Sequence, residues 1–362
     1  MSIQSTVKPE RHLGIDLLRI IAMLMVCTLH GNMFTGGLYK HPGHEDFQFM
    51  SSLTEAMCII GVNVYALITG YMMVNARWKL ERYLALWLQV AFYVVGIVLL
   101  SWGLTAVGVW PADKVDYGYD SYNMLLLFFG SENWYFASYS VLYFLLPFVN
   151  PLLLSLGQRR HAMLLLLLCV VLPVVNIFSA DYVYAAGYNF VWLGVMYVLG
   201  AYVKLYRPQC PAWLLIAVSM LCIAAHTMAR EFATDSTLLK ACTDYTSLFT
   251  IAYALCVFLF FEKSRPRSRW ACVLISFFSP LTFGIFLAHT HTSITRFLHP
   301  AYRYFSYCMD YSWWIPFLAG PAIFLAFSLP ELLRIHLFRL LRVGKWTKGL
   351  SALIERPSKG DV

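Results

Sequence analysis

Two charged residues and a histidine interrupt the first apolar run of the sequence, DLLRIIAMLMVCTLHGN, which covers residues 16–32. Asp16 and Arg19 lie near its start, and His30 lies near its end. Ionisable residues inside an apolar span are costly and usually mark a functional site. A guanidinium can bind an anionic group through charge-assisted hydrogen bonds, and an imidazole can exchange protons near neutral pH. These residue types therefore predict an anion-binding group and an acid–base group in one segment.

The spacing of these residues places them on one side of a helix. Arg19 and His30 are eleven positions apart (30 − 19), which is three helical turns plus roughly 20°, or about 16 Å along the axis. Asp16 lies near the same face, which should point into a helix bundle because lipid would penalise it. Two structural explanations stay open: an interfacial Asp16–Arg19 ion pair whose arginine reaches toward water, and a helix-capping His30.

The elements that carry these residues are predicted from composition and hydropathy. The 362 residues are 60% hydrophobic and 13% charged, whereas soluble domains are about 25% charged. Crossing a bilayer takes roughly 20 apolar residues, and such runs recur along the chain. We expect an all-α polytopic membrane protein with about ten transmembrane helices. The predicted spans are 13–33, 52–74, 83–108, 133–155, 162–180, 188–206, 212–229, 245–262, 271–295 and 313–334.

Basic residues are concentrated in alternate connections between these spans, which predicts that both termini are cytoplasmic. We expect a cytoplasmic N-terminus at 1–12, a transmembrane domain at 13–334 and a basic cytoplasmic tail at 335–362. The tail segment HLFRLLRVGKW either lies on the inner membrane surface or simply fixes the orientation. Because the net charge of +8 arises from these short clusters, it predicts contact with membrane lipids and no nucleic-acid partner. The expected location is the cell membrane (inner, cytoplasmic), as a multi-pass protein, and a homo-oligomer is left open.

Cysteine and histidine spacing does not predict a metal site. The nine cysteines include no CxxC pair, which a zinc ribbon or a redox motif would need. Cys242 and Cys308 lie in predicted outer loops and could pair, although free thiols are the simpler interpretation. A zinc site from His289, His291 and His30 is disfavoured, because positions i and i+2 point apart on a helix. No metal is therefore expected.

Four segments resemble, in order, the acyltransferase 3 family of integral membrane acyltransferases, of the bacterial O-acetyltransferase type. They are IDLLRIIAMLMVCTLHGN, with an arginine, ten residues and a histidine, then GVNVYALITGYMM (61–73), NWYFASYSVLYFLLPFVNPLL (133–153) and SPLTFGIFLAHTHTSI (279–294). The resemblance runs nearly from end to end. The chain departs from the family in having Ala85 where many members carry a second arginine, and Tyr139 or Ser140 where many carry a glutamate.

The resemblance implies a membrane enzyme that moves an acyl group, usually acetyl, from cytoplasmic acyl-CoA to a hydroxyl of an extracytoplasmic or lipid-linked glycan. Acetyl-CoA is then the expected acyl-donor co-substrate, and a glycan or lipid-linked sugar is the acceptor. The implied catalytic residues are His30 as base or acyl carrier, Arg19 and His289. A histidine suits this role because a sugar hydroxyl is a poor nucleophile near neutral pH.

Further residues are candidates for binding the two substrates. The donor candidates are basic and precede or start predicted spans: Arg19, Arg77, Lys79 and Arg82. The acceptor candidates are polar or aromatic residues of the matched segments: Asn63, Tyr71, Trp134 and Tyr135. Each has a structural alternative, namely orientation of the chain for the cations, interhelical hydrogen bonding for Asn63 and an interfacial aromatic belt for Trp134 and Tyr135.

A transporter or flippase for a lipid-linked or polar metabolite is the alternative function. Ten spans with buried polar residues suit a secondary transporter, but the inverted repeats common in transporters are not visible in the sequence. Dependence on acetyl-CoA separates the two: an enzyme releases free CoA thiol when its acceptor is present, and a transporter does not.

Overall fold

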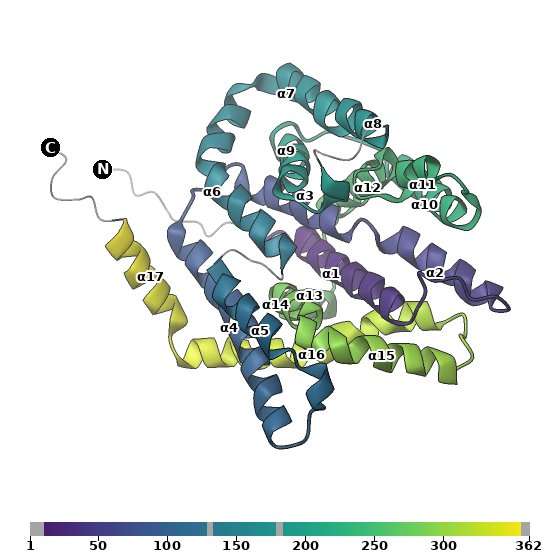
Figure 1. Ribbon diagram of the computed structural model, residues 1–362. Helices are drawn as coiled ribbons and strands as arrows, with labels where there is room; N and C mark the ends of the chain where they lie inside the picture. The colour runs from purple at the N-terminus through teal and green to yellow at the C-terminus, as the bar shows by residue number, and fades with distance from the viewer. Residues whose placement is uncertain (1–10, 129–132, 179–183, 356–362) are drawn as a thin grey trace.

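The computed structural model describes residues 11–128, 133–178 and 184–355, and over these residues the chain is helical without strands (Figure 1). Parts of the predicted termini, and the last residues of the predicted span 162–180, lie outside the described residues. Nine helical segments of the described chain are long and apolar enough to cross a membrane, which confirms the all-α polytopic class. They are α1 (Leu13–Phe34), α2 with α3 (Glu45–Met73), α4 (Leu80–Ala106), α6 (Trp134–Ser155), α7 with its continuation (Gly157–Val175), α10 (Ala212–Phe232), α11 with α12 (Ser236–Lys263), α13 with α14 (Arg269–His289) and α16 (Ile315–Leu340).

A tenth apolar helix, α9 (Phe190–Tyr206), is shorter and lies where the span 188–206 is predicted. Several of the long segments are broken into two helices, and short helices connect others. Their bounds are α2 (Glu45–Cys58), α3 (Gly61–Met73), α5 (Tyr117–Leu125), α7 (Gly157–Leu166), α8 (Leu172–Ile177), α11 (Ser236–Thr243), α12 (Leu248–Lys263), α13 (Arg269–Phe278), α14 (Thr282–Thr290), α15 (Thr292–Cys308) and α17 (Val343–Ile354).

Helix α6 matches its predicted span despite its two prolines, and helix α16 is longer than predicted. Helix α6 continues through Pro147 and Pro151, because a bundle can supply other partners for the backbone groups that proline frees. Helix α16 runs to Leu340 instead of ending at 334. The segment HLFRLLRVGKW is therefore divided between the end of α16 and the start of α17, with Arg342 in a left-handed conformation between them.

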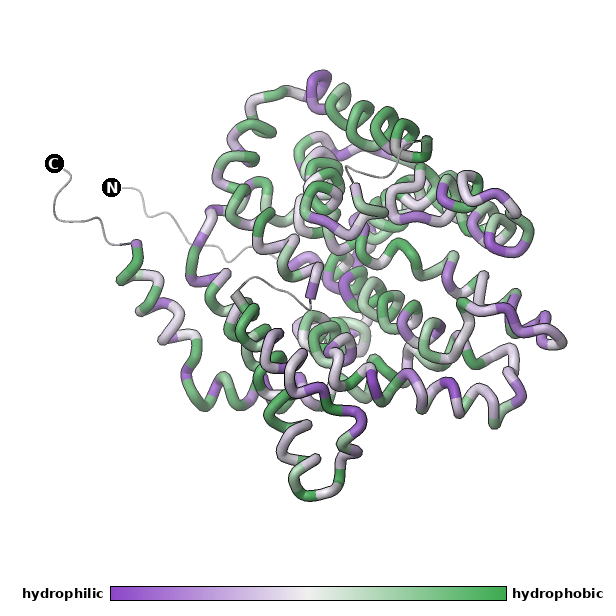
Figure 2. The backbone as a smooth tube through the Cα atoms, viewed as in Figure 1, coloured by the Kyte–Doolittle hydropathy of each residue, from purple (hydrophilic) through white to green (hydrophobic). Residues whose placement is uncertain are grey.

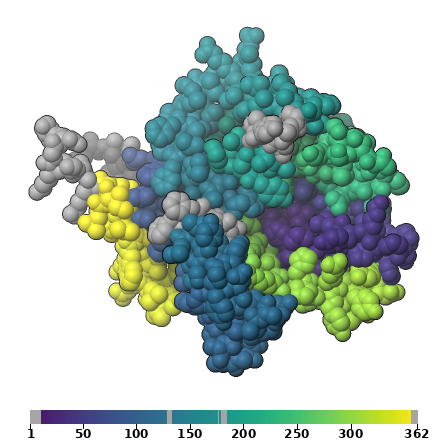
Figure 3. Space-filling view, in the orientation of Figure 1, coloured from purple at the N-terminus to yellow at the C-terminus, as the bar shows by residue number. Residues whose placement is uncertain are grey.

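Helix α1 runs from the middle of Figure 1 toward the right and helix α16 runs the opposite way, so α1 begins and α16 ends on the same side of the bundle. We call this the inner side and the opposite side the outer side, following the orientation predicted from charge. Figure 2 shows hydrophobic residues from the end of α7 into α8 and hydrophilic residues gathered in the loop between α1 and α2. In Figure 3, α1 and α2 lie between the part of the molecule containing α10 and the part containing α15. Helix α1 is thus enclosed by its neighbours.

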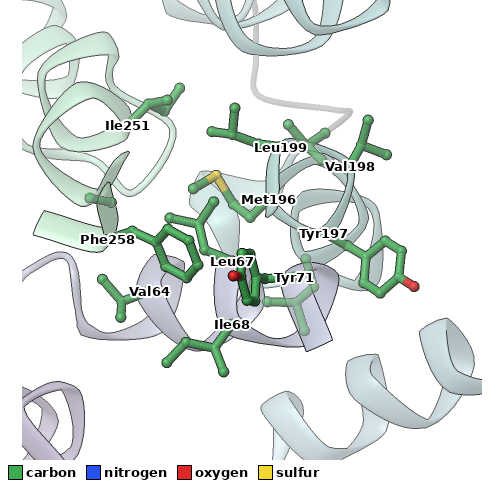
Figure 4. Close-up of a cluster of buried hydrophobic side chains, with 14 of the residues drawn as sticks. Val64, Leu67, Ile68, Tyr71, Met196, Tyr197, Val198, Leu199, Ile251 and Phe258 are labelled. Atoms are coloured by element: carbon green, nitrogen blue, oxygen red, sulfur yellow. The ribbon is translucent and has the colours of Figure 1, made fainter. Parts of the chain in front are cut away.

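Helices α3 and α9 approach each other closely in the core, and glycines make this contact possible. A Cβ at Gly70 would lie 2.0 Å from the main-chain oxygen of Tyr197, and one at Gly200 would lie 2.1 Å from that of Leu67. Small residues commonly allow membrane helices to pack at such distances. Figure 4 shows the apolar side chains that close around this contact: Val64, Leu67, Ile68 and Tyr71 of α3, Met196, Tyr197, Val198 and Leu199 of α9, and Ile251 and Phe258 of α12.

Replacing Gly200 by alanine should destabilise the bundle, because the new methyl group collides with the backbone of α3 and forces the helices apart. Overpacking of this kind costs about 1–3 kcal/mol or more. Gly194→Ala on the same helix is the matched control, since no atom lies within 4 Å of its added Cβ. The stability of each variant is measured as the temperature at which half of the monodisperse peak of detergent-solubilised protein is lost. Equal midpoints for the two variants would contradict the prediction.

Glycines also fix α1 against α16. A Cβ at Gly31 would lie 2.7 Å from the Cβ of Ala319, and one at Gly320 would lie 2.1 Å from Oγ1 of Thr28. Gly31 directly follows His30, so the depth and rotation of His30 are set by this tight contact.

Candidate active site

Three cavities follow one another along α1, from the inner to the outer side. The inner cavity is the largest, with a volume of about 580 Å³. It is lined by Arg11, His12, Ile15, Asp16, Arg19, Tyr71, Met72, Lys204, Ser279 and Pro280. Its cations come from the start of α1 and the end of α9, so this cavity suits an anionic ligand.

The outer cavity has a volume of about 230 Å³ and contains His30. It is lined by Val26, Leu29, His30, Val62, Asn133, Trp134, Tyr135, Tyr188, Tyr245, Phe286 and Thr290. Between the two lies a narrow space of about 30 Å³, which we call the neck. It is lined by Met23, Val26, Val62, Tyr65, Tyr135, Phe283 and Phe286. The face of α1 that carries Arg19 and His30 therefore runs along all three.

A buried carboxylate organises the inner cavity. Asp16 is 6% exposed and accepts hydrogen bonds from Nη1 of Arg19 at 3.0 Å and from Oγ of Ser279 at 3.1 Å. It also pairs with Arg11. Across the cavity, Nζ of Lys204 lies 4.4 Å from the centre of the Tyr71 ring. Asp16 thus pairs with two arginines at the cavity wall, and this pairing offsets the cost of burying its own charge.

His12 adds a neutral hydrogen-bond donor to the inner cavity. Its Nδ1 accepts from the main-chain N–H of Ile15 at 3.2 Å and caps α1. Burial, with a smaller contribution from Arg265, lowers the pKa of His12 below its ordinary value. The ring is therefore neutral at pH 7 with its proton on Nε2, and this buried atom has no partner among the described residues.

His30 and His289 form a hydrogen-bonded pair whose tautomers follow from their partners. Nδ1 of His289 lies 2.7 Å from the main-chain oxygen of Ile285, and a carbonyl only accepts, so this nitrogen carries the proton. In a neutral ring, Nε2 of His289 must then accept the 2.8 Å hydrogen bond from Nδ1 of His30. Nε2 of His30 is left with a free lone pair. It has no protein partner within the described chain, so His30 presents a base to the outer cavity.

Aromatic side chains form the wall opposite His30. The Trp134 and Tyr188 rings meet edge to face at 4.9 Å, and Tyr188 meets Tyr245 at 5.2 Å. Oδ1 of Asn133 accepts from the main-chain N–H of Phe136 at 3.0 Å and so starts α6 at this point. The cap therefore fixes Trp134 at the cavity. Flat rings with polar edges suit a ligand with both apolar faces and hydroxyl groups.

The family comparison decides what kind of protein carries this site. The model of a family described as "acyltransferase domain" matches residues 12–330. The chain belongs to the acyltransferase 3 family. No curated protein and no solved structure matches it. The resemblance noted in the four sequence segments is thereby confirmed, and the protein is a membrane acyltransferase.

The acyltransferase fold brings together several of the predicted site residues. His30 and His289 meet at the outer cavity, which Trp134 and Tyr135 also line. Arg19 lines the inner cavity, and so does Tyr71, which donates to Glu262 at 2.9 Å. The predicted acceptor residue Tyr71 therefore lies at the opposite end of α1 from His30.

Four other predicted residues do not line these cavities. Asn63 is fully buried: its amide donates to the main-chain oxygen of Tyr245 at 2.9 Å, and its oxygen accepts from Nε1 of Trp192 at 2.8 Å. Because Asn63 is fully buried and both ends of its amide are hydrogen-bonded within the protein, it supports Tyr245 and does not contact a ligand in the outer cavity. The cations Arg77, Lys79 and Arg82 are exposed at the start of α4. Cys242 and Cys308 are free thiols.

Several residues at or near the cavities have no role in the site that the sequence predicts. Lys204 and Arg11 belong to the basic clusters that predict the orientation of the chain, yet both line the inner cavity. Glu331 is fully buried in α16 beside Gly284 of α14. It accepts from Arg334 at 2.6 and 2.8 Å and from Tyr93 at 2.7 Å. Glu331 is the single carboxylate in the last apolar span, and this is the sequence signal that could have identified it as a candidate.

Proposed function

We propose that this acyltransferase lies in the cytoplasmic membrane and moves an acetyl group from acetyl-CoA at the inner cavity to a sugar hydroxyl in the outer cavity. The acceptor is a glycan or a lipid-linked sugar. One observation carries the proposal: a row of cavities along α1 has Arg19 at one end and the free Nε2 of His30 at the other.

The inner cavity supplies what an acyl-CoA needs for binding. Arg19, Lys204 and Arg11 line it and would bind phosphate oxygens by charge-assisted hydrogen bonds. Nε2 of His12 offers a further neutral donor. The pantetheine arm has about twelve backbone bonds and spans roughly 14 Å when extended, by the bond lengths that set the reach of a peptide. That matches the separation of about 16 Å between Arg19 and His30, so a thioester whose phosphates are held at Arg19 reaches His30.

The transfer uses His30 as general base. Nε2 of His30 takes the proton of the acceptor hydroxyl while the hydroxyl oxygen attacks the thioester carbonyl. The C–O bond forms, the C–S bond breaks, and the sulfur leaves with the electron pair and takes the proton from His30. The products are an acetyl ester and free CoA thiol. His289 acts on His30, since its Nε2 accepts from Nδ1 of His30 and stabilises the imidazolium that forms.

Variants of His289 test its positioning of His30. His289→Ala removes the acceptor and should lower turnover by up to roughly 10⁴-fold, because His30 loses its fixed tautomer. His289→Gln places an amide oxygen where Nε2 lies and should recover much of this loss. His289→Asn, whose oxygen matches Nδ1 instead, should not. Initial rates of CoA thiol release measure all three; equal activity of the Gln and Asn variants would contradict the assigned hydrogen bond.

The proposed function is tested with membranes that contain the protein and envelope material as acceptor. We expect release of CoA thiol. We also expect transfer of label from [¹⁴C]acetyl-CoA to base-labile material in the envelope fraction. Membranes without the protein are the control. Movement of a labelled glycolipid across the bilayer with no thiol release would favour the transporter instead.

A further inference from the structure

Helix α14 carries His289, yet it is a short helix of nine residues, Thr282–Thr290. A 3₁₀ turn, Ser279–Leu281, separates it from α13, and the extended backbone of His291 separates it from α15. Neither neighbour in the chain therefore continues α14 as a regular α-helix. The depth and rotation of His289 then depend on the side chains against which α14 packs.

We infer that Glu331 of α16 fixes α14 and is thereby a positioning residue for His289. The inference rests on the proposed function, in which His289 accepts a hydrogen bond from His30 and orients it. It adds a residue that lines none of the three cavities and acts on the transfer through His289.

The carboxylate of Glu331 is itself held in one orientation. The side chain is fully buried, and each of its oxygens accepts two hydrogen bonds. Oε1 accepts from Arg334 at 2.6 Å and from Gln89 at 3.2 Å. Oε2 accepts from Arg334 at 2.8 Å and from Tyr93 at 2.7 Å. Because Arg334 belongs to α16 whereas Gln89 and Tyr93 belong to α4, donors from two helices fix the carboxylate.

This carboxylate lies directly against the backbone of α14. A Cβ at Gly284 would lie 2.0 Å from Oε2 of Glu331 and 2.1 Å from its Cδ, so the contact requires a glycine. Ile285 follows Gly284, and its main-chain oxygen is the acceptor that fixes Nδ1 of His289. One helical turn before Glu331 on α16, the ring of Phe327 lies 6.1 Å from the ring of His289 between centres. Contacts at Gly284 and at His289 thus set the rotation and the depth of α14.

The stability of the fold does not by itself account for the Glu331–Arg334 ion pair. Replacing a buried ion pair by apolar residues is often neutral or stabilising, because both charges lose their hydration on burial. A carboxylate in a fully satisfied hydrogen-bond network has, in contrast, a single geometry that an apolar side chain would not impose on α14. Such a geometry matters at a catalytic group, since a displacement of about 1 Å can lower a rate by about 10²-fold.

Glu331→Asp tests this inference. Aspartate keeps a carboxylate for Arg334 but is one methylene shorter, so it withdraws from Gly284. We expect kcat for CoA thiol release to fall by about 10- to 100-fold, while KM for acetyl-CoA stays unchanged because the inner cavity is intact. Glu55→Asp is the matched control. It shortens the carboxylate of the Glu55–Arg230 ion pair, which lines none of the three cavities, and it should leave kcat unchanged.

The same substitution in a His289→Ala background separates positioning from a general loss of structure. If Glu331 acts through His289, Glu331→Asp should change the residual kcat there by no more than about twofold. Equal losses with and without His289 would overturn the inference, and so would wild-type kcat in Glu331→Asp. If Glu331→Asp does not fold, Tyr93→Phe decides in its place: it removes only the hydroxyl that holds Oε2 and should lower kcat only when His289 is present. Absence of acyl transfer by the wild-type protein would overturn the proposed function instead.

Discussion

His30→Ala should abolish acyl transfer while leaving the protein folded in the membrane. The free Nε2 of His30 is the one imidazole base among the described residues that line the outer cavity. General base catalysis contributes about 10²- to 10⁴-fold, so turnover should fall by at least that range. The substitution removes a side chain with one hydrogen bond, to His289, so the α1–α16 contact at Gly31 should persist. CoA thiol release per mole of purified protein is the measurement.

His226→Ala is the matched control for this experiment. His226 is 2% exposed and lies in α10, and no residue of α10 lines the inner cavity, the neck or the outer cavity. His226→Ala therefore removes a buried imidazole and leaves the residues that line the three cavities unchanged. His226→Ala should retain acyl transfer in folded protein. Full activity of His30→Ala would show that another group accepts the proton.

Arg19→Ala should weaken donor binding more than it slows the chemical step. A hydrogen bond to a charged group is worth about 1.5–3 kcal/mol, so KM for acetyl-CoA should rise by roughly 10- to 100-fold. Asp16 keeps Arg11 and Ser279 as partners, so the inner cavity should not collapse. Arg19→Lys should recover part of the affinity, because it restores the charge without the planar fork.

Arg77→Ala is the control that separates the cavity from the exposed cations. Arg77 is exposed and does not line the inner cavity, although the sequence makes it a candidate for binding CoA phosphates. A KM increase for Arg19→Ala with little change for Arg77→Ala would place the phosphates in the inner cavity. A larger increase for Arg77→Ala than for Arg19→Ala would place the phosphates beside the start of α4 instead.

The predictability of the site differs between residues close in sequence and residues far apart. Arg19 and His30 share a helix, and helical periodicity alone predicts their common face. Their relation to His289, which is 259 residues from His30, depends on how α14 packs. Asn63 shows the opposite case: a polar residue in an apolar span looks like a ligand-binding group, but tertiary contacts with Tyr245 and Trp192 occupy it.

By itself, the sequence determined the membrane class, the number of apolar segments, the family and the Arg19–His30 face, because hydropathy and helical periodicity are local properties. Only the tertiary structure decided the tautomer of His30, the place of Lys204 in the inner cavity and the neck lined by Val62 and Phe286. Each of these depends on side chains from different helices meeting at fixed distances. Those distances are set by close contacts at Gly31, Gly200 and their neighbours, which no local pattern specifies.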